Sequence, residues 1–96
     1  MRIQLSEGAL EDLIGGYRFY EHQSTGLGDY FLDSVCADIE SLRLYAGTHP
    51  RHLGYHRLLA RRVPFAIYYR TESNLIRICA VLDCRRDPAW IRDRLA

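Results

Sequence analysis

The spacing of apolar residues changes once along this chain, near residue 54, and that change limits the possible folds more than any other feature. Before residue 54, apolar side chains recur every three to four residues, the period of an amphipathic helix. They form two series: Leu10, Leu13, Ile14, Tyr17 and Tyr20, then Phe31, Leu32, Val35, Ile39, Leu42 and Ala46. After residue 54, short runs rich in β-branched and aromatic residues predict strands.

Local signals place the ends of the two helices. "RIQL" at 2–5 predicts a short strand, and Ser6 is suited to cap the helix that follows it. "STGLG" at 24–28 separates the two helices, and so short a break predicts an antiparallel helical hairpin. The hairpin is expected to end before Gly47 and Pro50. Polar side chains are expected on its other faces: Glu11, Asp12, Arg18, Asp29, Asp33, Asp38 and Glu40.

Two adjacent glycines, Gly15 and Gly16, interrupt the first predicted helix. Each glycine weakens a helix by roughly 1 kcal/mol relative to alanine. Two explanations remain open at this point, a tolerated weakness or the close approach of another helix.

The second half predicts three strands and a final helix. The strands are "YHRLLARR" at 55–62, "FAIYYRT" at 65–71 and "LIRICAVL" at 75–82. Asp87 is suited to cap a last helix that has Pro88 at its first position. The element order is β-α-α-β-β-β-α, which predicts one α+β domain over residues 1–96. In it the helical hairpin packs on a mainly antiparallel sheet.

Composition excludes several classes of protein. The chain has no long apolar run that would span a membrane, and its N-terminus lacks the features of a secretory signal, so a cytoplasmic protein is expected. Three cysteines without framework spacing favour free thiols. The histidines His49, His52 and His56 lie in a predicted loop and strand, so neither a metal nor a cofactor is expected.

The two halves of the chain differ in charge. Residues 1–50 contain three arginines and eight acidic residues, whereas residues 51–96 contain ten arginines and four acidic residues. All thirteen basic residues are arginine, which excludes a lysine general base. A basic C-terminal half suggests an anionic partner.

Three stretches resemble the RelE/ParE superfamily of toxins from type II toxin–antitoxin modules. They are "FYEHQSTGLGDYFLDSV" at 19–35, "RRVPFAIYYR" at 61–70 and "AVLDCRRDPAWIRDRL" at 80–95. The resemblance implies a helical hairpin on a microbial-ribonuclease-like sheet, and a cognate antitoxin that wraps and neutralises the toxin. Such modules include plasmid stabilisation systems. No cofactor is implied.

The superfamily contains two mechanisms. RelE-like members cut messenger RNA in the ribosome with basic residues and an acid–base set, whereas ParE-like members act on DNA gyrase. A ribonuclease of this sequence would draw on Arg62, Tyr69, Arg85 and His56. The chain has no lysine to act as a base, and Asp83 stands where many relatives have histidine, so the ParE-like mechanism is favoured. A third possibility is a silenced relative that only binds its antitoxin.

The expected contacts with partners follow from these alternatives. Target binding is predicted at Arg61, Arg62, Arg85 and Arg86, and antitoxin binding at Leu10, Leu13, Ile14 and Tyr17 wherever core packing leaves them exposed. The competing interpretation of Arg85 and Arg86 is that one pairs with Asp83 or Asp87 and the other is solvated. Since side chains alternate along a strand, either Tyr68 or Tyr69 is expected beside arginines. Phe65, Tyr68 and Tyr69 are otherwise expected in the core.

Overall fold

The computed structural model describes all 96 residues and has the predicted α+β architecture. Its elements are β1 (Arg2–Leu5), α1 (Glu7–Gln23), α2 (Leu27–Tyr45), β2 (Arg51–His52), β3 (Tyr55–Leu59), β4 (Phe65–Glu72), β5 (Leu75–Asp83) and α3 (Pro88–Leu95). The strands form one sheet in the order β1-β5-β4-β3-β2, in which only the β1–β5 pairing is parallel. The prediction missed the two-residue β2 and extended β3 past its end at Leu59.

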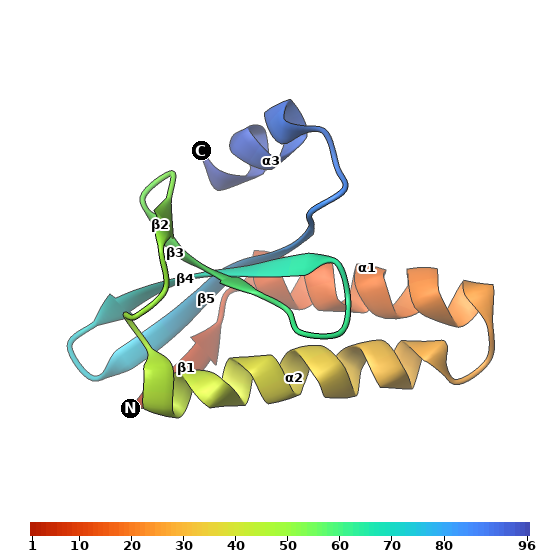
Figure 1. Cartoon of the computed structure of the whole chain (residues 1–96), viewed down its shortest axis with the longest axis horizontal. Coiled ribbons are helices and arrows are strands. Elements are labelled where there is room, and N and C mark those ends of the chain that lie inside the picture. The colour runs from red at the N-terminus through yellow and green to blue at the C-terminus, as the bar shows by residue number, and fades with distance from the viewer.

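The elements form three layers (Figure 1). The long helices α1 and α2 run antiparallel on one face of the sheet, and the short α3 lies on the opposite face. The predicted caps are confirmed, because Ser6 Oγ accepts from Ala9 N at 3.0 Å and Asp87 Oδ1 accepts from Ala89 N at 2.9 Å. No helix combines the length and apolarity needed to cross a bilayer.

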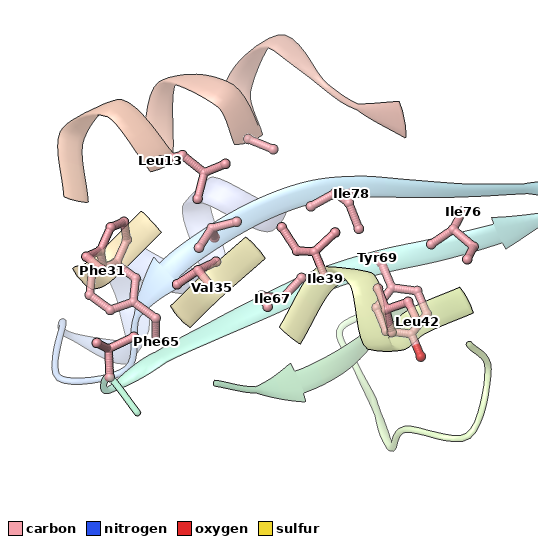
Figure 2. Close-up of a cluster of buried hydrophobic side chains, with 13 residues drawn as sticks. Leu13, Phe31, Val35, Ile39, Leu42, Phe65, Ile67, Tyr69, Ile76 and Ile78 are labelled. Atoms are coloured by element: carbon pink, nitrogen blue, oxygen red, sulfur yellow. The ribbon is translucent and has the colours of Figure 1, made fainter. Parts of the chain in front are cut away.

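The larger core lies between the hairpin and the sheet (Figure 2). Thirteen buried residues form it, and Figure 2 shows Phe31, Val35, Ile39 and Leu42 of α2 directed toward Phe65, Ile67, Tyr69, Ile76 and Ile78 of β4 and β5. A smaller cluster of six buried residues holds α3 on the other face: Ala66, Tyr68, Ala80, Leu82, Ile91 and Leu95. The expectation that Phe65, Tyr68 and Tyr69 are core residues is therefore confirmed.

Helix α1 buries a different stripe from the one that its largest side chains predict. Its buried residues are Ala9, Leu13 and Gly16, whereas Leu10 and Ile14 are exposed. The reason is close packing, since small residues let α1 approach its neighbours. A Cβ atom on Gly16 would lie 2.3 Å from Cζ of Phe31 in α2, whereas one on Gly15 would meet nothing within 4 Å. The close-approach explanation therefore holds for Gly16 and not for Gly15.

Two acidic side chains predicted on the outer helix faces lie against other elements instead. Asp38 of α2 is buried, and its Oδ2 accepts from the backbone N–H of Arg61 at 3.1 Å. Asp12 of α1 accepts from Val81 N at 3.0 Å and also binds both terminal nitrogens of Arg94. Buried polar groups are stable only when hydrogen-bonded, and each carboxylate here satisfies a backbone N–H that no strand pairs.

Candidate functional site

The four arginines predicted to bind a target come together at one end of the sheet. Arg61 and Arg62 lie on the loop between β3 and β4, and Arg85 and Arg86 lie between β5 and α3. The two loops are adjacent, because Cys84 N donates to Pro64 O at 2.8 Å. All four side chains are exposed. Contacts within the chain nevertheless divide them into different roles.

Arg85 is committed to a partner within the chain. Its Nε donates to Asp83 Oδ1 at 3.0 Å, its Nη2 donates to Oδ2 at 2.8 Å, and its backbone N–H also binds Oδ1. The side-chain hydrogen bond from Arg85 lowers the pKa of Asp83 below its ordinary value. The competing interpretation, that one of the two arginines pairs with Asp83, is therefore correct for Arg85.

Arg86 is neither paired nor simply solvated. Its guanidinium carbon lies 3.8 Å from the centroid of the Trp90 ring, in a cation–π contact. A guanidinium stacked in this way keeps its in-plane N–H donors available. Only four arginines form ion pairs with a carboxylate, namely Arg43, Arg77, Arg85 and Arg94. Arg86 is thus a positioned, unpaired cation at the edge of α3.

A second group of basic residues lies on the sheet face that carries α3. Arg70 on β4 and Arg77 on β5 are direct register partners, so they share a face, and the Arg70 guanidinium lies 4.3 Å from the centroid of the Tyr55 ring. Arg57 is opposite Tyr68, and its Nε donates to the Tyr68 hydroxyl at 3.3 Å. We call Arg57, Arg70 and Arg77, with Tyr55 and Tyr68, the basic face. The alternation of side chains along each strand could have suggested that these residues share a face, but only the observed register of β4 with β5 places Arg70 opposite Arg77.

The residues proposed for a ribonuclease are not gathered in one place. Tyr69 and His56 stack with ring centroids 5.1 Å apart, on the face covered by the hairpin. The Tyr69 hydroxyl accepts from Gly47 N at 3.0 Å and contacts His49 Nδ1. Arg62 and Arg85 lie at the end of the sheet instead. The tyrosine beside an arginine is Tyr68, so the alternation argument is confirmed but Tyr69 is the wrong member of the pair.

The antitoxin-binding residues predicted on α1 divide by burial. Leu10 and Ile14 are 52% and 43% exposed, and Tyr17 is half-buried against Gly28 of α2. Leu13 is only 5% exposed and belongs to the core, so it cannot line a docking surface in this fold. Leu10, Ile14 and Tyr17 recur at helical spacing, and we call them the α1 stripe. The histidines His49, His52 and His56 belong to no group of three or more possible metal ligands.

The strand order, the helical hairpin and the position of α3 define a RelE/ParE-like fold, as the sequence predicted. A chain of the solved structure described as the chromosomal ParDE TA system from P. aeruginosa superposes on this protein with a TM-score of 0.71. It is 19% identical in sequence, and the superposition covers 84% of this chain and 92% of that one. No protein-family model and no curated protein matches the sequence.

Proposed function

We propose that this protein is the toxin of a type II toxin–antitoxin module, that it inhibits DNA gyrase as ParE-like toxins do, and that a cognate antitoxin neutralises it. The observation that carries the proposal is the shared fold with a chain of the ParDE TA system, over 84% of the length of this protein. The three sequence stretches that resemble the RelE/ParE superfamily support the same class. A gyrase inhibitor would act in the cytoplasm.

Gyrase is favoured over messenger RNA because the residues predicted for a ribonuclease do not lie together: Tyr69 and His56 lie under the hairpin, whereas Arg62 and Arg85 lie at the end of the sheet. Attack of an RNA 2′-hydroxyl on the adjacent phosphate, with departure of the 5′-oxygen, needs a base, an acid and cations around that phosphate. Cations are present on the basic face, and the Arg57–Tyr68 contact is the observation that supports the alternative, a ribosome-dependent endoribonuclease. Tyr68, however, is buried and its hydroxyl already accepts from Arg57. No histidine or carboxylate forms a hydrogen bond with the side chain of Arg57 or of Tyr68.

Target contact is assigned to the arginines that are free of carboxylates. Arg61, Arg62 and Arg86 are exposed and unpaired at one end of the sheet, so they offer donors to an anionic surface. Arg85 contributes by holding the loop between β5 and α3 through Asp83. This assignment keeps three of the four predicted residues as direct contacts and gives Arg85 a positioning role.

Antitoxin binding is assigned to the α1 stripe. Its side chains lie one turn apart along α1, as in helices that receive an amphipathic helix of a partner. Leu10 and Ile14 are large, apolar and exposed, so their position on the surface does not stabilise the isolated chain, and such exposed apolar side chains often mark a binding site for a partner. A double substitution, Leu10→Ser with Ile14→Ser, should weaken antitoxin binding while leaving the fold intact. Substitution of buried Leu13 should instead unfold the protein.

The experiment that tests the proposed function runs two assays on the purified protein. The first measures linear, cleaved DNA in gyrase reactions, and the second measures cleavage of messenger RNA on programmed ribosomes. We expect trapped cleaved DNA with the unmodified protein, a large loss with Arg86→Ala, and a smaller loss with Arg85→Ala. Arg92→Ala, an exposed arginine on α3 without an ion pair, is the matched control and should retain activity.

The outcomes separate the alternatives. Cut messenger RNA with unaffected gyrase would overturn the proposal and direct attention to Arg57 and Tyr68. Inactivity in both assays, with antitoxin binding retained, would identify a silenced relative. Equal loss with Arg86→Ala and Arg92→Ala would show that general charge, rather than the stacked guanidinium, governs the interaction.

A further inference from the structure

One corner of the sheet lies far from the arginines assigned to the target. The ladder between β3 and β4 begins at His56 opposite Tyr69, so the last residues of β4 continue beyond it. The end of β4 and the turn of the β2–β3 hairpin form this corner, whereas the loop that carries Arg61 and Arg62 lies at the other end of β4 (Figure 1). The two sites are separated by about 24 Å, the length of an eight-residue strand.

A pocket of about 190 Å³ opens at this corner. Its lining comes from β2, from the turn after it, from β3 and from the end of β4: Arg51, Gly54, His56, Arg70, Thr71 and Glu72. None of these residues is hydrophobic. Pockets that bury a drug-sized molecule have about 300–1,000 Å³ and mostly apolar walls. This pocket therefore suits a small and strongly polar group.

The two arginines of the pocket have no carboxylate partner. Arg51 and Arg70 are exposed and form no ion pair. The guanidinium carbon of Arg70 lies 4.3 Å from the centroid of the Tyr55 ring, and stacking leaves its in-plane N–H donors available. Glu72 is the single acidic residue in the pocket, and its Oε2 lies 3.7 Å from Nη2 of Arg77. The pocket therefore has more positive charge than its own carboxylate neutralises.

The strand register adds a repulsion that a bound anion would offset. Arg70 and Arg77 are direct partners across β4 and β5, and like charges opposite each other destabilise a sheet. Because Glu72 pairs with Arg77, the charge of Arg70 is left without a counterion.

His56 supplies a third, oriented side chain. Its Nδ1 lies 2.9 Å from the carbonyl oxygen of His49, which only accepts, so Nδ1 carries a proton. The imidazole ring also stacks on Tyr69. Nε2 is thus the ring nitrogen left for a ligand, and it donates to an anion when the ring is protonated.

We propose that this corner pocket binds a phosphate monoester, with Arg51, His56 and Arg70 as its donors. A monoester has three terminal oxygens for the three side chains, which come from three strands, whereas a carboxylate or an internal phosphodiester has only two. Arginine binds phosphate through paired N–H groups, which favours the same ligand. The monoester can belong to a small molecule or to the 5′ end of an RNA. This inference goes beyond the proposed function and holds whichever target the protein has.

The test measures binding to the purified protein by isothermal titration calorimetry at constant ionic strength. The probes are inorganic phosphate, AMP, and one RNA tetranucleotide with either a 5′-phosphate or a 5′-hydroxyl, and acetate is the control anion. Arg51→Gln and Arg70→Gln each remove a proposed donor. Arg92→Gln, which changes an exposed arginine of α3 that forms no ion pair, is the matched control. Circular dichroism checks that all three variants are folded.

We expect inorganic phosphate and AMP to bind, and acetate to bind at least about tenfold more weakly. Arg51→Gln and Arg70→Gln should each weaken phosphate binding at least about tenfold, because each removes charge-assisted hydrogen bonds, and Arg92→Gln should not. In NMR spectra, the amide signals of Gly54 and Thr71 should shift when phosphate is added.

The RNA probes identify the source of the monoester. If binding depends on Arg70, tighter binding of the 5′-phosphorylated RNA than of AMP would support an RNA end, and the reverse order would support a small molecule. Equal affinity for the two RNA probes would overturn the inference. Equal loss with Arg70→Gln and Arg92→Gln would also overturn it, and so would the absence of phosphate binding.

Discussion

The two faces of the sheet differ in what holds them. The face under the helical hairpin is closed by thirteen buried residues, among them the rings of Phe31 and Phe65, whose centroids lie 4.9 Å apart. The opposite face has a cluster of six buried residues under a helix of only eight residues, and three arginines flank it. The hairpin face therefore carries most of the buried apolar packing, and the opposite face combines a smaller core with the charged side chains of Arg57, Arg70 and Arg77.

Removing an aromatic ring from the covered face should have the largest effect on stability. Phe31 is fully buried, and Phe31→Ala should lower the free energy of unfolding by about 3–5 kcal/mol, because it leaves a cavity in the main core. Ile91→Ala, in the cluster under α3, should cost only about 2 kcal/mol. Urea denaturation measures both values. If the Ile91 substitution costs as much as the Phe31 substitution, the two faces contribute equally and the comparison fails.

The adjacent glycines of α1 offer a sharper contrast on the same helix. Gly16→Ala should destabilise the protein by about 1–3 kcal/mol, since its Cβ would overlap the Phe31 ring. Gly15→Ala should stabilise it by about 0.5–1 kcal/mol, because nothing obstructs the new methyl group and alanine favours the helix. Thermal unfolding of the two variants side by side gives the sign of each effect. Destabilisation by both would mean that Gly15 is also needed for close packing.

Asp12 is the single side chain that joins the hairpin, the sheet and α3. Asp12→Ala should cost about 1–3 kcal/mol, because it leaves the Val81 N–H without an acceptor and frees Arg94. The neighbouring exposed Glu11→Ala, which removes no hydrogen bond, should change stability by less than about 0.5 kcal/mol. Hydrogen exchange at the Val81 amide should quicken in the first variant and remain slow in the second.

The contact between His49 and Tyr69 predicts a pH dependence confined to the hairpin side of the molecule. Burial, and secondarily the charge of nearby His56, lowers the pKa of His49 below its ordinary value of 6.5. Folding therefore favours neutral His49, so its contribution is fully present above pH 6.5 and is lost as the pH falls through the lower pKa of the folded state. Unfolding followed by denaturant from neutral pH down to about pH 5 should show this loss.

His49→Gln is the control for this pH effect. The amide keeps a polar side chain near the Tyr69 hydroxyl but cannot titrate, so the stability of this variant should vary less over the same range. An unchanged pH profile would assign the acid sensitivity to other groups, such as Asp83. Because Arg85 lowers the pKa of Asp83, its contribution is lost only at more acidic pH, as the carboxylate becomes protonated.

Much of the fold could be predicted because its signals are local. The helices that the spacing predicts and the Ser6 and Asp87 caps depend on residues a few positions apart, and they are confirmed, although the buried stripe of α1 differs from the predicted one. The pairing of Arg85 with Asp83 is also local, because the two residues are two positions apart. It was one of the two interpretations that the sequence offered for Arg85 and Arg86, the other being direct contact with a target. The position of four arginines at one end of the sheet also follows from where two strand connections fall in the sequence.

The sequence by itself therefore determined the three helices, the strands other than β2, their order and the sign of charge in each half of the chain. Only the tertiary structure decided which stripe of α1 is buried, that Asp12 and Asp38 satisfy backbone groups of distant segments, and that Tyr68 rather than Tyr69 meets an arginine. It also decided that Arg51, His56 and Arg70 line one pocket at a corner of the sheet. The physical reason is that register and close packing depend on residues far apart in sequence, whose fit no local pattern encodes.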